Sequence, residues 1–145
     1  MSGIVVGVDG SGHSRRALEW AMREAALRQL PLTVVTVHTA GAGYFGPVSH
    51  PGDIDLTQHA RGEALKEVAG VRHELGGSVP AAVEVLAVTG IPAEELLSAA
   101  KDADLLVVGS RGAGGFARLL MGSVSSQVAH HAHCPVVIIP AEEPV

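Results

Sequence analysis

Residues 3–9 read Gly-Ile-Val-Val-Gly-Val-Asp, and this stretch decides the fold class. The strand-forming residues Ile4–Val8 are interrupted only by Gly7, so apolar side chains point to both faces. A strand that is apolar on both faces is typical of the centre of a parallel sheet that helices cover on each side. The stretch therefore predicts an α/β protein.

Short β-branched runs alternate with longer helical patterns along the rest of the chain. The predicted strands lie at Gly3–Val8, Leu32–Val37, Ala82–Val88, Leu105–Val108 and Val136–Ile139. The first predicted helix begins after a cap at Ser11 or Ser14 and ends near Leu30. The second covers Ile54–Leu75, the third begins at Pro92, and the fourth covers Ser123–His131. This alternation requires a parallel sheet with helices on both faces. A length of 145 residues fits one domain, residues 1–145.

The two longest predicted helices each carry an apolar stripe that is expected to face the sheet. In the first helix the stripe consists of Leu18, Ala21, Met22 and Ala25. In the second it consists of Leu56, Ala60, Ala64, Leu65, Val68 and Leu75.

Composition excludes several classes of protein. A hydrophobic fraction of 47% with 17% charged residues excludes a disordered chain. No apolar run reaches the roughly 18–20 residues of a membrane span, and the start does not resemble a secretory signal. A net charge of −5 and few aromatic residues argue against nucleic-acid binding. The single cysteine, Cys134, fits a reducing compartment, so we expect a cytoplasmic protein.

The pattern breaks between His38 and Gly52, where glycine and proline recur, and this segment is expected to be a long loop. Tyr44 and Phe45 within it are candidates for a lid over a ligand, or for a cover on apolar surface.

Ligands of an open parallel sheet bind at the carboxyl ends of its strands, close to the point where strand order reverses. Asp9 follows the first strand, a glycine-rich loop over 109–115 follows the fourth, and Gly122-Ser123 precedes the last helix. Glycine backbone and a helix start both present N–H groups to an anion, so a phosphate site is one interpretation. The other interpretation is a tight turn followed by a helix cap, in which Asp9 is a turn aspartate and not a ligand.

Two common nucleotide motifs are absent. The loop does not end in Gly-Lys-Ser or Gly-Lys-Thr, and the turn after the first strand lacks the glycine spacing of the dinucleotide fingerprint.

The spacing Gly109-x2-Gly112-x9-Gly122-Ser123 resembles the nucleotide-binding pattern of the universal stress protein family. The opening at residues 4–11 and the ending at 133–139 resemble the same family, so the likeness spans the whole chain. It implies a five-stranded parallel sheet in the order 3-2-1-4-5, on a Rossmann-like fold similar to the adenine nucleotide alpha-hydrolases. Because the glycine spacing is complete, it also implies the ATP-binding subclass.

The resemblance implies roles for particular residues. Asp9 is expected near the ribose and a Mg²⁺ ion, since that cation prefers oxygen ligands. The backbone of Val37 is expected to meet adenine. The full set of expected nucleotide-binding residues is Gly7, Asp9, Val37, Gly109, Arg111, Gly112, Gly115, Gly122, Ser123, Val124 and Ser125.

Basic and sulfur-containing side chains offer further candidates. Arg111 suits a phosphate oxygen, and Arg118 is either a second phosphate ligand or a solvated loop residue. The stretch His130–Cys134 invites a zinc or copper site, but neighbouring side chains of a helix diverge, and histidines also suit a helix C-terminus. Cys134 itself is expected to be a small buried hydrophobe rather than a redox-sensitive thiol.

Three functions remain open. The first is an ATP-binding regulatory protein with slow or no hydrolysis, which forms a homodimer through Val136–Ile139 and has unidentified protein partners. The second is a nucleotide hydrolase or transferase on the same fold. The third is a scaffold that binds no nucleotide. No catalytic residue is assigned, because neither a Gly-x-Ser-x-Gly elbow nor a loop lysine is present.

Overall fold

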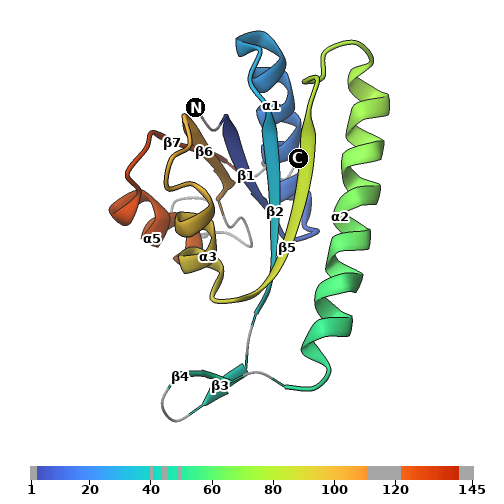
Figure 1. The fold of residues 1–145 in the computed structure, drawn as a ribbon. Coiled ribbons are helices and arrows are strands. Elements are labelled where there is room, and N and C mark those ends of the chain that lie inside the picture. Colours follow the sequence, from blue (N-terminus) through green and yellow to red (C-terminus); the bar gives the residue numbers. More distant parts are fainter. Residues whose placement is uncertain (1–2, 40, 44–45, 49, 111–121, 141–145) are drawn as a thin grey trace, which may run out of the picture.

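The computed structural model describes residues 3–39, 41–43, 46–48, 50–110 and 122–140. Five parallel strands form one sheet in the order β5-β2-β1-β6-β7, which is 3-2-1-4-5 along the chain, as the resemblance implied (Figure 1). The strands are β1 Ile4–Val8, β2 Leu32–Thr39, β5 Val83–Gly90, β6 Leu105–Gly109 and β7 Val136–Ile139. The helices are α1 Gly12–Arg28, α2 Asp53–Leu75, α3 Pro92–Ala99 and α5 Ser123–His131.

The central strand β1 divides the interior into two apolar layers. Ile4 and Val6 are fully buried on the face that α1 and α2 cover. Val5 is buried on the other face, in the layer that α3 and α5 close. The strand is thus apolar on both sides because both sides lie inside the protein, which confirms the prediction from residues 3–9.

Helix α1 follows the sequence prediction closely. The Ser11 hydroxyl caps it by accepting a hydrogen bond from the amide of Ser14, at 3.3 Å. All four residues of its predicted stripe are buried. The helix ends at Arg28, two residues before the predicted end, because Gln29 adopts the left-handed conformation.

The predicted stripe of α2 is partly wrong. Leu56 and Leu65 are exposed, at 52% and 41%, whereas Val71 is fully buried. Residues 64, 68, 71 and 75 follow the helical repeat and meet the sheet, and positions 56 and 65 fall off that line. Apolar composition alone did not identify the buried face.

The segment from His38 to Gly52 is not one continuous loop, so that expectation is wrong. Strand β2 continues to Thr39, and a short antiparallel hairpin follows, formed by β3 Gly41–Gly43 and β4 Gly46–Val48 (Figure 1). The hairpin lies beyond the end of the main sheet. Glycine and proline do not exclude a two-stranded hairpin of this size, because its ladder is short and both strands are edges.

A buried carboxylate closes the base of this hairpin. Asp53, the first residue of α2, accepts from the amide of His50 at 2.6 Å and lies 2.9 Å from Nε2 of His38. Beside it, the hydroxyls of Thr57 in α2 and Thr89 in β5 are hydrogen-bonded. These contacts tie the ends of β2 and β5 to the start of α2. The hydrogen bond from the backbone amide of His50, followed by the hydrogen bond with the side chain of His38, lowers the pKa of Asp53.

We expect Asp53→Asn to be less stable than the wild type at pH 7, and the difference to narrow as the pH falls below about 3.9, the ordinary pKa of aspartate. A carboxylate whose folded-state pKa is lowered contributes stability above its unfolded pKa and loses it as the pH falls through the folded value. Urea unfolding midpoints across this range measure the effect. Asp55→Asn is the matched control, since it removes an exposed carboxylate from the same helical turn. A stability gap that is independent of pH contradicts the prediction.

Among the helices that the structure describes, none combines the length and apolarity needed to span a bilayer.

Candidate functional site

A cavity of about 250 Å³ opens at the carboxyl ends of the strands. It lies where strand order reverses, because β1 pairs with β2 on one side and with β6 on the other. Its described lining is Gly7, Val8, Asp9, His13, Ser14, Val35, Val37, Thr39, Pro92, Leu96, Val108, Gly109, Gly122, Ser123, Val124 and Ser125.

One wall of the cavity is apolar. Val35 and Val37 come from β2, Val108 from β6, and Pro92 and Leu96 from the first turns of α3. A Cβ atom at Gly7 would lie 2.9 Å from Cδ2 of Leu96, so the glycine lets Leu96 pack closely against β1. Flat apolar walls of this kind suit an aromatic ring.

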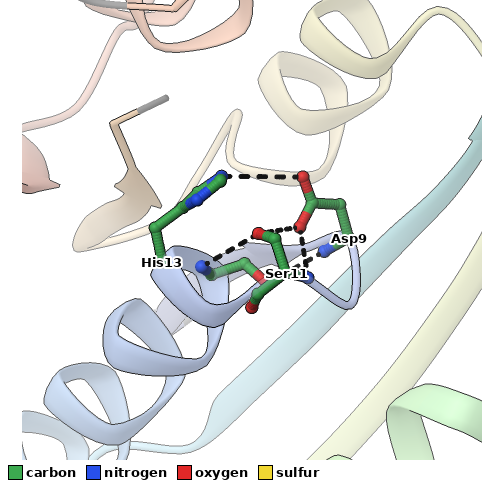
Figure 2. Close-up of polar contacts among 4 residues, drawn as sticks. Asp9, Ser11 and His13 are labelled. Carbon is green, nitrogen blue, oxygen red and sulfur yellow. Dashed lines mark hydrogen bonds and ion pairs between the residues drawn. The ribbon is translucent and has the colours of Figure 1, made fainter. Parts of the chain in front are cut away.

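Asp9 presents one carboxylate oxygen to the turn and the other to the cavity. Oδ1 accepts from the amide of Ser11 at 2.9 Å and from the Ser11 hydroxyl, while Oδ2 faces Nε2 of His13 at 4.0 Å (Figure 2). The hydroxyl of Ser14 accepts from the amide of Asp9 at 3.2 Å and completes the turn. Asp9 is therefore a turn aspartate through Oδ1, and its Oδ2 is directed away from the turn.

The turn also controls the charge of Asp9. Partial burial raises the pKa of this carboxyl, but hydrogen bonds with Ser11 and Ser14 and the nearby imidazole of His13 outweigh burial and leave the pKa below its ordinary value. The side chain remains 67% exposed. The cavity therefore contains a carboxylate that is ionised at neutral pH.

The amino end of α5 supplies N–H groups on another side of the cavity. Gly122 caps the helix with extended backbone, at φ −66° and ψ 164°, and makes no side-chain cap. The amides of Ser123, Val124 and Ser125 belong to the first turn, where no intrahelical acceptor exists. The side chain of Ser125 is buried, and its hydroxyl donates to the Gly122 carbonyl at 3.1 Å, a contact within the first turn of α5.

Gly109 is a glycine for a reason that the sequence did not reveal. A Cβ atom at this position would lie 2.8 Å from the carbonyl oxygen and 3.1 Å from the carbonyl carbon of His13. The next amide, that of Ser110, donates to the Ile139 carbonyl at 2.8 Å and extends the sheet. The end of β6 therefore packs directly against the backbone of α1.

Every predicted nucleotide-binding residue that the structure describes lines this cavity: Gly7, Asp9, Val37, Gly109, Gly122, Ser123, Val124 and Ser125. Arg111, Gly112, Gly115 and Arg118 lie outside the described residues, as do Tyr44 and Phe45.

Sequence reasoning missed several lining residues, and His13 is the most important of them. Its position in the first turn of the helix after Asp9 was the available signal, because helical side chains tilt toward the helix N-terminus. Thr39 was missed because β2 was expected to end at Val37.

The stretch His130–Cys134 is the candidate that the sequence offers for a zinc or copper site. Within the part of the chain that the structure describes, no three His, Cys, Asp or Glu side chains gather closely enough to hold an ion. Cys134 is partly buried against the second apolar layer. Burial raises the pKa of its thiol, despite a backbone hydrogen bond with Leu106, so the thiolate form is disfavoured.

Comparison with known proteins agrees with this fold. A universal stress protein of Mycobacterium tuberculosis is 38% identical over 150 residues, covering 99% of this chain and 49% of that protein. The chain thus spans about half the length of the curated relatives it matches. A crystal structure of a universal stress protein in complex with cAMP has a TM-score of 0.67 at 29% identity, and the match covers 95% of each chain.

A second structure, the universal stress protein from Archaeoglobus fulgidus in complex with dAMP, has a TM-score of 0.64 at 27% identity, over 96% of this chain and 98% of that one. The model of the Universal stress protein family matches residues 1–140. Because the family model covers residues 1–140 and the sheet has the strand order that the resemblance implied, this chain belongs to the universal stress protein family.

Proposed function

We propose that this chain binds an adenine nucleotide, with ATP as the ligand, in the cavity between Asp9 and the amino end of α5. The observation that carries the proposal is one cavity with three chemically distinct sides. An apolar wall suits the base, an ionised carboxylate suits a ribose hydroxyl or a cation, and helix N–H groups suit phosphate. Two relatives were solved with the adenine nucleotides cAMP and dAMP.

Each part of the nucleotide has a place in this proposal. The base lies against the apolar wall and meets the backbone of Val37. The phosphates meet the amides at Ser123 and Val124, with Arg111, Gly112 and Gly115 of the preceding loop as further ligands. Gly7 and Gly109 line the cavity and let Leu96 and the His13 backbone pack closely against the strand ends, and Gly122 and Ser125 shape the helix start.

The chemistry of Asp9 fits Mg²⁺, because this cation is commonly held by one or two carboxylates together with substrate phosphates. When bound, Mg²⁺ would neutralise phosphate charge. Asp9 Oδ2 is the oxygen that this chain offers to it, or alternatively to a ribose hydroxyl.

We propose a regulatory role rather than a catalytic one. Phosphoryl transfer needs a positioned base and a charge clamp, and the described lining offers Asp9 as its one carboxylate. A bound nucleotide would act by favouring one conformation over another. We also propose a homodimer, since β7 lies at the edge of the sheet with apolar residues along it, and edge strands favour pairing. The proposal also includes unidentified regulatory protein partners and a cytoplasmic location. The free thiol of Cys134 supports that location, because free thiols are typical of reducing compartments.

Purified protein is expected to retain an adenine nucleotide, and native mass spectrometry detects it directly. Calorimetric titration with ATP and Mg²⁺ is expected to give a dissociation constant below the millimolar range. Release of phosphate should stay below about 1 s⁻¹, the low end of ordinary enzyme rates. Absence of binding up to millimolar ATP rejects the proposed function, and faster turnover rejects the regulatory role in favour of an enzyme.

A further inference from the structure

We propose that Asp9 and His13 together recognise one ribose hydroxyl of the bound nucleotide, so that this chain prefers a ribonucleotide to the analogue that lacks this hydroxyl. The inference rests on the proposed function and adds a specificity-determining residue, His13, to it. Both side chains line the cavity, and Figure 2 shows the imidazole and the carboxylate facing each other across the start of α1.

The distance between the two groups carries the argument. Nε2 of His13 lies 4.0 Å from Oδ2 of Asp9, which is too far for a hydrogen bond. Two hydrogen bonds of about 2.8 Å that meet at one oxygen with an angle of about 90° span this same distance. A single oxygen atom placed between the groups therefore contacts both without any movement of the protein.

The chemistry of the pair selects the kind of oxygen. The ionised carboxylate of Asp9 only accepts hydrogen bonds, whereas the imidazole of His13 donates one when Nε2 carries a proton. A hydroxyl donates to the first and accepts from the second. A phosphate oxygen has no proton for Asp9 and is repelled by it. A cation is repelled by the imidazole N–H, and two adjacent ligands at about 2.1 Å from one Mg²⁺ ion lie only about 3 Å apart.

Both groups are held in place by their surroundings. Hydrogen bonds from Ser11 to Oδ1 fix the carboxylate and direct Oδ2 toward His13. His13 lies in the first turn of α1, so its side chain tilts back over Asp9, and it is only 24% exposed. Gly109 packs closely against the His13 backbone and so fixes the first turn of α1. A preorganised pair loses little entropy when it meets its ligand.

The test compares the affinities of ATP, 2′-deoxy-ATP and 3′-deoxy-ATP by calorimetry, at one pH, with Mg²⁺ and again with EDTA. For the wild type we expect one of the two deoxy analogues to bind about tenfold more weakly than ATP, in both media. His13→Phe is expected to bind ATP only as tightly as the wild type binds the weaker analogue, and to lose the preference for ATP over that analogue. His13→Gln, which restores a donor, is expected to recover part of it. Melting temperatures confirm that each variant is folded.

Thr39→Val is the matched control, because it removes a hydroxyl group from the same cavity and is expected to change all three affinities by the same factor. The inference is rejected if the wild type binds the three nucleotides equally, if the preference survives in His13→Phe or disappears in Thr39→Val, or if it exists only with Mg²⁺. Failure of the wild type to bind any of the three rejects the proposed function itself, which is a different result.

Discussion

Gly122→Glu is expected to weaken ATP binding by at least about a hundredfold, or about 2.7 kcal/mol of binding free energy. The new carboxylate would lie at the amino end of α5, where it repels phosphate and accepts from the amides that the phosphate needs. The backbone of Gly122, at φ −66° and ψ 164°, is a conformation that any residue adopts. A negative charge at a helix start is favourable, so the variant should remain as stable as the wild type.

Calorimetric titration with ATP, paired with thermal unfolding, measures both parts of this prediction. Gly62→Glu is the matched control, since it adds the same charge on α2, where no atom lies within 4 Å of the new Cβ. The control should bind ATP as the wild type does. If Gly122→Glu keeps wild-type affinity while folded, the amino end of α5 is not the phosphate site.

The fold was predictable because its signals are local. Runs such as Ile4–Val8 and Leu105–Val108 are apolar on both faces, and Gly or Pro residues mark the ends of most elements. Alternation of strand and helix then leaves a parallel sheet as the solution. The order of the strands was not derivable from these patterns, and it came from the resemblance of the glycine spacing to a known family.

The features that the sequence did not reveal depend on contacts between distant elements. Leu65 and Val71 are both apolar, and only the packing of α2 on the sheet buries one and exposes the other. His38 has no local signal for its partner Asp53, which lies 15 residues away across a hairpin. His13 is an exception, because it lies only four residues from Asp9 and its position in the first turn of α1 was an available signal. Burial and pairing of this kind are tertiary, so periodicity carries little information on them.

The glycine spacing that identified the site combines two physical requirements. Gly122 begins α5 with ordinary extended backbone and lines the cavity, so under the proposed function its value lies in the space left for the nucleotide. Gly109 lies against the backbone of α1, so its value lies in the close approach of two elements of the fold. Substitutions at these two positions should therefore fail in different ways.

We expect Gly109→Ala to lower the free energy of unfolding by about 1–3 kcal/mol, the usual cost of overpacking. The added Cβ would lie 2.8 Å from the His13 carbonyl oxygen, and backbone atoms cannot move aside as a side-chain tip can. Urea denaturation measures the loss. Gly12→Ala is the control, because it adds the same methyl group next to His13 where no atom lies within 4 Å, and it should not destabilise the protein. A Gly109→Ala protein of wild-type stability that binds ATP weakly would show instead that this glycine serves the ligand directly, and the packing argument would be wrong.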